Sequence, residues 1–386
     1  MKIGDLGEFA LIEKIKAILP SGGPGVLVGI GDDVAVLSMA APQAAASATP
    51  APAGPAAPVP ATANADPAAN AVAGAGADET VWLATCDVQV EGSHFLRSAI
   101  DPRDLGHKVL AVNLSDVASA GGKPRFALVS LGLPKDLEVA FVEGLYEGLR
   151  EEAGRFGVEI VGGNISSVRH GLFIDLFLLG EAKKSEVLLR SGARPGDRIL
   201  VTGSLGDAAA GVALLLDPGL GAATNTGYED YYLRAARRRD RPEPRVREGL
   251  IIGAAKKASA MIDLSDGLSG DLGHIFERSG VSARIVAADL PVARENRALS
   301  LAAKGDEWHF ALHGGEDYEL LFTCPPDSAA MLAASIREAT GTLVTDIGAI
   351  TKAGEPAQLV LPDGRIIGLG GGGWDHFART TGGEKR

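Results

Sequence analysis

Acidic side chains stand at the ends of short apolar runs, where a strand is expected to pass into a turn. Residues 81–84 form such a run and lead to Asp87, and the next lysine or arginine along the chain is Arg97. A carboxylate at the end of a buried strand is destabilising unless a cation or hydrogen-bond donors meet it. Other acids in similar strand-end or turn positions are Asp32, Asp33, Asp116, Asp263, Asp266, Glu316 and Asp317. We expect these carboxylates to converge on divalent metal ions that hold a polyphosphate.

Magnesium suits such a group of acids. Carboxylates gathered in water-poor surroundings repel one another, and several would otherwise have to be protonated. Mg²⁺ prefers oxygen ligands and is often held by carboxylates together with substrate phosphates. Cys86 lies beside Asp87 without a basic neighbour and is a poor thiolate candidate, and the histidines do not have zinc-ligand spacing. Since no Ser-His-Asp or Cys-His arrangement stands out either, we expect metal-assisted chemistry without a side-chain nucleophile.

Two of the acidic motifs are ambiguous when each is taken alone. The sequence G-I-G-D-D at residues 29–33 suits a tight turn that presents carboxylate oxygens and backbone amides, but an ordinary acidic turn has the same pattern. Asp116 lies one turn after Asn113 near the C-terminus of an expected helix. A negative charge is disfavoured there by roughly 0.3–1 kcal/mol, which points weakly to function. A solvated aspartate at this position is equally compatible with the helix.

Two further motifs could bind phosphate. Residues 158–161 predict a strand that feeds Gly162, Gly163, Asn164 and nearby serines, and backbone amides in such a turn can cradle a phosphate. The same pattern is typical of an ordinary strand-to-loop turn. Arg190 could bind a phosphate through a bidentate guanidinium fork, although arginines are also common on protein surfaces.

The elements that must position these residues alternate between helices and strands. Asp101, followed by a proline, predicts the N-terminus of a helix that ends at Gly121 and Gly122. Further helices are expected at residues 8–19, 141–156 and 272–278, and strands at residues 26–30, 126–133, 172–179, 198–201 and 321–324. The character of the chain changes near Glu181. We therefore expect an α/β protein of two domains, residues 1–181 and 182–386.

Length and composition are those of a soluble globular protein. The chain has 386 residues, of which 46% are hydrophobic and 22% charged, and is long enough for two domains with cores of their own. No apolar stretch is long enough to span a bilayer, and acids at positions 5, 8 and 13 argue against a secretory signal. The two cysteines imply no disulfide framework. We expect a cytoplasmic protein without a membrane partner.

The net charge of −12 argues against nucleic acid as the main partner. It does not exclude an anionic substrate, because metal ions can reverse the local sign of the electrostatic potential. Residues 40–78 are mostly alanine and proline, a composition that excludes a helix and offers few large apolar side chains for a core. We interpret this stretch as a disordered insertion in a loop between two strands, which the slow growth of loop-closure entropy with length tolerates.

Together the motifs resemble those of the thiamine-monophosphate kinases, within the wider group of ATP-binding proteins that share the fold of aminoimidazole ribonucleotide synthetase. The resemblance rests on G-E-F-A-L-I, G-I-G-D-D, T-C-D-V-Q-V-E-G-S-H-F, K-V-L-A-V-N-L-S-D-V-A-S-A-G, R-S-G-A-R-P-G-D, V-T-G-S-L-G-D-A-A-A-G, I-D-L-S-D-G-L, G-G-E-D-Y-E-L and W-D-H-F. These motifs follow the family's order and span nearly everything except the Ala/Pro-rich stretch. V-E-G-S-H-F together with G-G-E-D-Y-E-L distinguishes the kinases from relatives that make selenophosphate or purine intermediates.

The resemblance implies an N-terminal domain whose mixed sheet pairs with its twin in a homodimer, and a C-terminal α/β domain that completes the cleft for ATP. ATP is then the co-substrate, several Mg²⁺ ions are required, and direct in-line transfer to thiamine monophosphate gives thiamine diphosphate. Both reactants are anionic, so charge neutralisation and alignment are the main catalytic tasks. The acceptor phosphate oxygen is already ionised near neutral pH, and a strong general base is unnecessary.

Motif positions in the family also imply roles for single residues. The implied magnesium ligands are Asp33, Thr85, Cys86 through its backbone, Asp87, Asp116, Asn164, Asp263 and Asp266. The implied ATP contacts are Gly163, Asn164, Arg190 and Ser265. The implied contacts to thiamine phosphate are His94, Glu316 and Trp374, the last by stacking on a cationic heteroaromatic ring.

One position departs from the family pattern. The kinases usually have aspartate where this chain has Asn164, and asparagine offers a metal one neutral oxygen without a charge. A metal site there is expected to be weaker or water-mediated. The substitution points to one alternative to a kinase, a non-catalytic nucleotide-binding relative that has lost a metal ligand. Another ATP-dependent synthetase of the same superfold is a second alternative.

Overall fold

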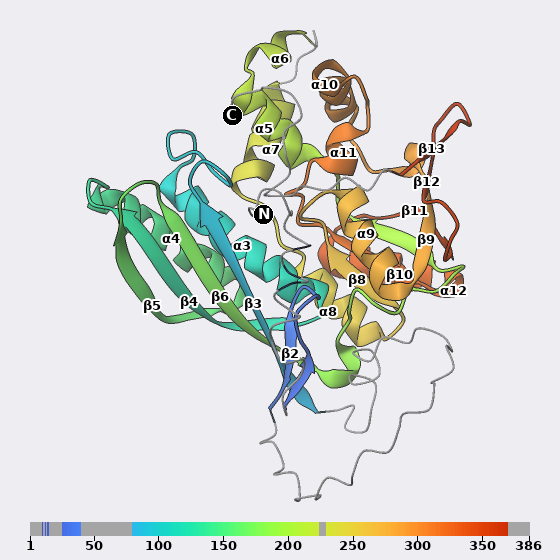
Figure 1. Ribbon diagram of the computed structural model, residues 1–386, viewed down its shortest axis with the longest axis horizontal. Coiled ribbons are helices and arrows are strands. Elements are labelled where there is room, and N and C mark those ends of the chain that lie inside the picture. The colour runs from blue at the N-terminus through green and yellow to red at the C-terminus, as the bar shows by residue number, and fades with distance from the viewer. Residues whose placement is uncertain are drawn as a thin grey trace, which may run out of the picture.

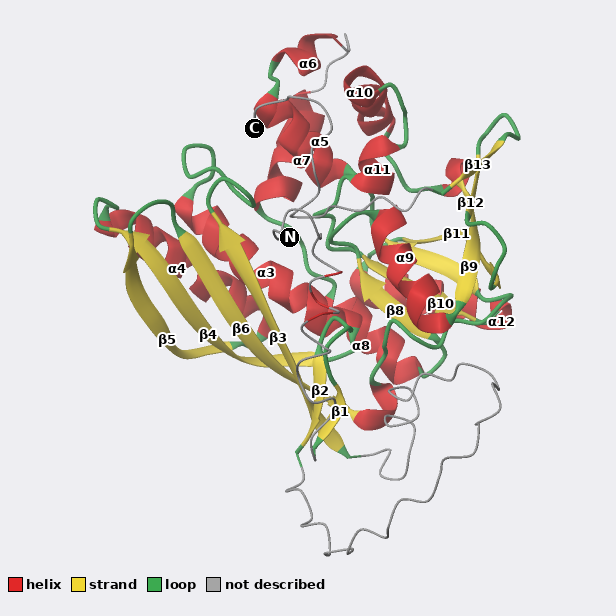
Figure 2. Cartoon of the chain, in the orientation of Figure 1, coloured by secondary structure: helices red, strands yellow, loops and turns green. Residues whose placement is uncertain are grey.

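The computed structural model describes residues 25–39, 79–223 and 229–369, together with Ala10, Ile12 and Lys14. Most of the helix expected at residues 8–19, the Ala/Pro-rich stretch at residues 40–78 and Trp374 lie outside the described residues. The strands form two sheets, and helices pack beside both of them (Figure 1, Figure 2). The expected α/β class is thereby confirmed. None of the helices in the described part of the chain combines the length and the apolar composition needed to cross a membrane.

The first sheet has the strand order β1-β2-β3-β6-β4-β5, in which β4 and β5 are parallel and the other paired strands are antiparallel. Its strands are β1 (Val26–Val28), β2 (Ala35–Ser38), β3 (Thr80–Val90), β4 (Lys123–Pro134), β5 (Glu159–Val168) and β6 (Phe173–Lys183). Helices α3 (Pro102–Ser119) and α4 (Val139–Phe156) cover one face of this sheet (Figure 1). We call the opposite face the outer face.

The second sheet has the order β13-β12-β9-β11-β7-β10-β8, in which only β12 and β9 are paired in parallel among the described strands. Its strands are β7 (Arg198–Thr202), β8 (Ala260–Asp263), β9 (Val281–Val286), β10 (Leu320–Cys324), β11 (Val344–Lys352), β12 (Gln358–Val360) and β13 (Ile366–Gly368). Its helical elements are η2 (Lys184–Glu186), α5 (Asp207–Leu216), α6 (Gly219–Ala223), α7 (Glu229–Asp240), α8 (Val246–Ala255), α9 (Leu268–Ser279), η3 (Ala287–Asp289), α10 (Arg294–Lys304), α11 (His309–His313) and α12 (Pro326–Thr340).

Helix α3 lies between the first sheet and the second half of the chain (Figure 1). It begins as expected, because the Asp101 side chain accepts a hydrogen bond of 2.8 Å from the Arg103 backbone N–H and proline occupies the first helical position. The helix contacts β3 and α4 on one side and α8 and β8 on the other. It is therefore buried nearly all around, and its few polar side chains must find partners inside the protein.

One hydrophobic core joins the two halves of the chain. Leu83 of β3, Leu110 of α3, Phe322 of β10 and Leu332 of α12 belong to the same cluster of buried residues. A second cluster, which includes Ile262 of β8, lies within the second half alone. The first sheet and the second half are thus packed against each other through apolar side chains.

Glycines allow α3 and α4 to pack closely, and this packing gives a test of the fold. A Cβ added at Gly148 of α4 would lie 1.9 Å from the Arg103 carbonyl oxygen, whereas nothing lies within 4 Å of a Cβ added at Gly154. We expect Gly148→Ala to lower the free energy of unfolding by about 2–3 kcal/mol, because backbone atoms would have to move apart. Gly154→Ala, the matched control on the same helix, should raise it by up to about 1 kcal/mol. Urea unfolding of both variants measures the difference, and equal effects would contradict the described packing.

Two local expectations were wrong. The turn expected at residues 162–167 does not form, because β5 continues through both glycines to Val168. Gly163 is needed instead for sheet packing, since a Cβ there would lie 1.8 Å from the Val129 carbonyl oxygen of β4. Asp87 likewise does not end a strand, because β3 runs on to Val90. The turn that follows β3 begins at Gly92, where φ is +85°.

Candidate active site

Three carboxylates from distant parts of the sequence meet beside α3. Asp33 comes from the loop between β1 and β2, Asp116 from the last turn of α3, and Asp263 from the end of β8. One oxygen of each lies within 4.8 Å of the others. The side chain of Asp33 is only 2% exposed, and Asp263 is buried. We call Asp33, Asp116 and Asp263 the acid group.

Each carboxylate of the acid group accepts a hydrogen bond from one hydroxyl. The Thr85 hydroxyl donates to Asp116 at 2.5 Å, Ser115 to Asp263 at 2.6 Å and Ser119 to Asp33 at 2.6 Å. Ser115 and Ser119 are one turn apart on α3, so a single helix face supports two of the three acids. These hydroxyls orient the carboxylates but carry no compensating positive charge.

Burial and mutual repulsion make two members of the acid group, Asp116 and Asp263, hard to ionise. Burial raises the pKa of Asp263 to about 8, and the charge of Asp33 contributes to the rise. Burial also raises the pKa of Asp116 well above its usual range, and the charges of Asp87, Asp263 and Asp33 add to the effect. Asp87 therefore lies close enough to act on this group, and the Asn113 side-chain oxygen accepts its backbone N–H at 3.1 Å. A cation among these oxygens would relieve the repulsion.

Arg190 supplies positive charge at the edge of the acid group. Its Nε donates to Asp33 at 2.7 Å, and its terminal nitrogen Nη2 contacts the same oxygen. Its backbone N–H donates to Asp32 at 3.3 Å. Arg190, which was expected to bind phosphate, is thus paired with a carboxylate. It belongs to the start of the second half of the chain.

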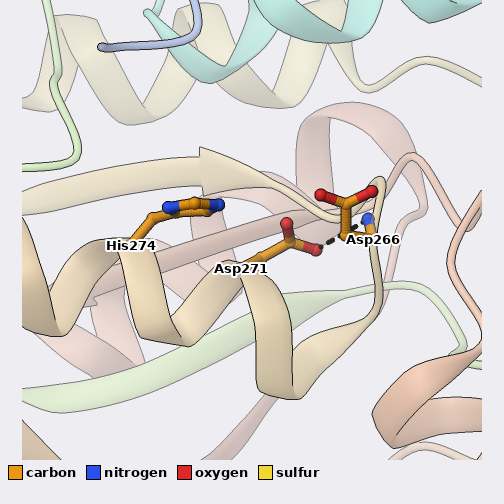
Figure 3. Close-up of side chains that lie close together, drawn as sticks. All are labelled: Asp266, Asp271 and His274. Carbon is orange, nitrogen blue, oxygen red and sulfur yellow. Dashed lines mark hydrogen bonds between the residues drawn. The ribbon is translucent and has the colours of Figure 1, made fainter. Parts of the chain in front are cut away.

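A second group of possible metal ligands forms on α9 and the loop before it. Asp266, Asp271 and His274 place one ligand atom each within 4.8 Å of one another (Figure 3). The Asp266 backbone N–H donates to Asp271 at 3.2 Å. Burial lowers the pKa of His274 to about 4, so its ring is neutral near pH 7. Asp266 was expected beside Asp33 and Asp263, but the structure places it in this separate group. Burial and the charges of Asp266 and Asp263 raise the pKa of Asp271, so the two groups are close enough to interact electrostatically.

Residues expected to contact thiamine phosphate meet around a buried lysine. The Lys108 ammonium lies 2.7 Å from a Glu316 oxygen and donates to the His94 carbonyl oxygen at 3.2 Å. The His94 ring nitrogen Nδ1 accepts the Val90 backbone N–H at 3.0 Å. The Glu316 backbone N–H donates to the Ser265 carbonyl oxygen at 2.8 Å. His94, Glu316 and Ser265, which belong to three separate motifs, are thus joined through short contacts.

Two expected residues, Gly163 and Asn164, are not brought to the acid group within one chain, and Cys86 lies beside that group through its backbone only. The Cys86 side chain points to the outer face of the sheet, where it donates to Asp175 at 3.0 Å, and burial raises the pKa of its thiol to about 12. Gly163 and Asn164 lie on the edge strand β5, which β4 and β6 separate from β3. Three strand spacings amount to about 14 Å, too far for direct contact with Asp87.

The sequence reasoning missed the residues that support the acids and Glu316. They are Lys108, Ser115, Ser119, Asp271 and His274. A signal was available on α3, because Lys108, Ser115 and Ser119 recur at the spacing of one helix face within a helix that is otherwise strongly apolar there. Such a polar stripe is compatible with solvent as well, so only the packing of α3 between the two halves shows that it is internal.

Comparison with known proteins places the chain in a family. Residues 31–182 match the family model "AIR synthase related protein, N-terminal domain", and residues 194–359 match "AIR synthase related protein, C-terminal domain". The chain is 34% identical to the thiamine-monophosphate kinase of Aquifex aeolicus over 98% of this chain and 100% of the relative. It is 35% identical to that of Escherichia coli K12 over 96% of this chain and 98% of the relative. The chain belongs to the thiamine-monophosphate kinase family.

Solved structures agree with this family membership. The structure named "AaThiL complexed with AMPPCP and TMP" is 34% identical, with a TM-score of 0.71 over 97% of this chain and 99% of that one. The thiamine-monophosphate kinase of Stenotrophomonas maltophilia is 32% identical, with a TM-score of 0.65 over 93% of this chain and 98% of that one. The hydrogenase maturation protein HypE of E. coli, at 18% identity and a TM-score of 0.62, shares the fold alone.

Proposed function

We propose that this thiamine-monophosphate kinase family member transfers the γ-phosphoryl group of ATP to the phosphate of thiamine monophosphate. Family membership supports the reaction. A solved relative, AaThiL, is a complex with AMPPCP and TMP. The observation that carries the proposal is the convergence of Asp33, Asp116 and Asp263 beside Arg190. Such an arrangement of buried and half-buried acids and a guanidinium suits metal-bound polyphosphate.

The acid group fits magnesium. Its donors are all oxygens, and the raised pKa values of Asp116 and Asp263 support the proposal, because a nearby cation would keep both carboxylates ionised at neutral pH. Asp33, Asp87, Asp116 and Asp263 would hold the ions, with Thr85 and the Cys86 backbone next to them and Asp266 contributing through the neighbouring group. When bound, Mg²⁺ neutralises phosphate charge and helps to align ATP with its acceptor.

The chain's own residues align the two anionic reactants. The Arg190 guanidinium, which pairs with Asp33 in this structure, can donate to an ATP phosphate through its fork. Ser265, whose carbonyl oxygen accepts the Glu316 backbone N–H, would contact ATP, while His94 and Glu316 would hold the thiamine end together with Trp374. An acceptor phosphate oxygen forms the new bond to the γ-phosphorus as the bond from that phosphorus to the β–γ bridging oxygen breaks. The products are ADP and thiamine diphosphate, and no proton needs to be removed from the acceptor.

We propose that the active protein is a homodimer formed by the outer face of the first sheet. Val88, Leu128 and Phe177 are 42%, 42% and 37% exposed on this face, an apolar area of the kind that marks an interface. Asn164 aligns with Ser130, Asp175 and Val88 in one row across the sheet, so it would enter the same interface. Gly163 and Asn164 would then contact ATP bound to the partner copy.

We propose that the chain has two domains, residues 1–181 and residues 182–386.

Replacing one apolar residue of the outer face tests the dimer. We expect the wild-type protein to have a two-chain mass by light scattering, and Phe177→Glu to have a one-chain mass and little activity. Leu233→Glu, a control at a 71% exposed leucine on α7, should change neither. A one-chain mass for the active wild-type protein would contradict the dimer.

The reaction itself is tested by incubating the purified protein with ATP, Mg²⁺ and thiamine monophosphate and measuring thiamine diphosphate. Equimolar ADP and thiamine diphosphate are expected, with no product when EDTA removes the metal. ATP binding without any product would favour the non-catalytic relative, and ATP consumption without thiamine diphosphate would favour another synthetase.

The free, exposed Cys86 thiol is compatible with the reducing cytoplasm, where we propose that the reaction takes place.

A further inference from the structure

We propose that Lys108 is a positioning residue for thiamine monophosphate, acting through Glu316. The inference rests on the proposed function, because it assumes that Glu316 contacts the thiamine end of the substrate. Lys108 lies on α3 and is only 1% exposed, which is unusual for a lysine. A buried ammonium is retained only where acceptors compensate for its lost hydration.

The two acceptors of Lys108 come from opposite halves of the chain. The His94 carbonyl oxygen belongs to the turn after β3, and the Glu316 carboxylate belongs to the loop before β10. Lys108 therefore links the two residues that are expected to hold the thiamine end. The side chain of Glu316 is 24% exposed, so its carboxylate is accessible from the site although its partner is not.

The backbone around Glu316 is fixed independently of Lys108. Glu316 and Tyr318 both have positive φ values, +60° and +49°, which are uncommon for residues other than glycine. The Asp317 carboxylate between them accepts the Gly206 backbone N–H at 2.8 and 2.9 Å. Arg245 donates twice to the buried Glu319 carboxylate, each time at 2.6 Å. The loop is thus held by Asp317 and Glu319, whereas the direction of the Glu316 carboxylate is set by Lys108.

Helix α3 relates this pair to the acid group. Lys108 and Asp116 are eight positions apart on the same helix, which is about 12 Å along its axis. Thiamine monophosphate is an elongated molecule with its phosphate at one end and its amino-bearing heteroaromatic ring at the other. A carboxylate held by Lys108, about two turns before Asp116 on α3, can accept from that ring while the phosphate lies near the acids. Without Lys108, the Glu316 carboxylate would lose the ammonium group that lies 2.7 Å away and would be able to turn toward solvent.

A set of four variants tests the role of Lys108. Lys108→Met removes the charge at similar length, Lys108→Arg keeps the charge, Glu316→Gln removes the carboxylate, and the fourth variant combines Lys108→Met with Glu316→Gln. KM for thiamine monophosphate and for ATP, kcat and the melting temperature are measured for each, and binding of thiamine monophosphate is measured by calorimetry. Wild-type protein run in parallel reports on the reaction itself.

Lys108→Met is expected to raise KM for thiamine monophosphate at least tenfold while KM for ATP changes less than twofold. Lys108→Arg should recover part of the loss. In the Glu316→Gln background, Lys108→Met should change KM for thiamine monophosphate less than twofold, because residues that act as a pair are not additive. A purely structural lysine would instead lower the melting temperature and move both KM values, equally in either background.

Three results would overturn the proposal. One is an unchanged KM for thiamine monophosphate in folded Lys108→Met, and another is an equally large effect of Lys108→Met in the Glu316→Gln background. If Lys108→Met alone does not fold, the double variant decides, since a further tenfold rise in KM over Glu316→Gln would show that Lys108 acts elsewhere. Wild-type protein that neither binds nor phosphorylates thiamine monophosphate is the third result, and it overturns the proposed function together with the role of Lys108.

Discussion

Replacing Asp116 with asparagine is expected to reduce thiamine diphosphate formation by roughly 10²–10³-fold and to raise the melting temperature of the metal-free protein. The activity falls because a preorganised charged group is lost where phosphate charge must be neutralised. The stability rises because one member of a buried, mutually repelling group becomes neutral at nearly constant shape. Opposite signs for activity and stability are the signature of a site maintained for function.

The control for Asp116→Asn is Asp104→Asn on the same helix. Asp104 lies in the first turn of α3, is partly exposed and pairs with Arg241 at 3.4 Å. Its replacement should leave turnover within twofold of the wild type, and its effect on the melting temperature should be below that of Asp116→Asn. Activity of Asp116→Asn within tenfold of the wild type would show that Asp116 is not needed to bind the reactants.

Raising the pH from 5 to 8 is expected to destabilise the metal-free protein by at least about 2 kcal/mol. Burial raises the pKa of Asp263 to about 8 and that of Asp32 to about 7, whereas both should titrate near 4 in the unfolded chain. Between these values the folded protein binds more protons than the unfolded one, so the free energy of unfolding falls as the pH rises. Urea unfolding in EDTA at several pH values measures the slope.

Mg²⁺ should reverse most of this loss at pH 8 and have little effect at pH 5. A cation that binds only the folded protein stabilises it by mass action, and it competes with protons for the same oxygens. Asp116→Asn is the control, because with one carboxylate removed both the pH slope and the response to Mg²⁺ should shrink. Stability that is independent of pH in EDTA would contradict the described burial of the acid group.

The acids were predictable from sequence because each occupies a local pattern that needs an explanation. Asp33 follows a glycine-rich turn, and Asp263 ends a short apolar run. That these acids meet Asp116 follows from the packing of three elements, which local patterns do not contain. The expectation that Asp33, Asp116 and Asp263 lie together came instead from the resemblance of the ordered motifs to the kinase family. The pairing of Arg190 with Asp33 could not be predicted, since a surface arginine and a buried one have the same neighbours in sequence.

Two features depended on tertiary packing and were misjudged or missed. The glycine pair at positions 162 and 163 was interpreted as a turn, although glycine also permits close approach between neighbouring strands, as at Val129. Lys108 has the spacing of a solvent-facing residue. It is buried because α3 is enclosed from both sides, and its partners Glu316 and His94 come from loops far away in sequence.

The hydrophobic core that spans Leu110 of α3, Phe322 of β10 and Leu332 of α12 has a consequence for how substrates enter and products leave. A hinge-like separation of the two halves would bring these side chains into water, at about 25 cal/mol for every Å² exposed. Such an opening is too unfavourable to recur in every catalytic cycle. We therefore expect turnover to proceed with a nearly rigid framework, in which loop and side-chain movements alone admit nucleotide and vitamin.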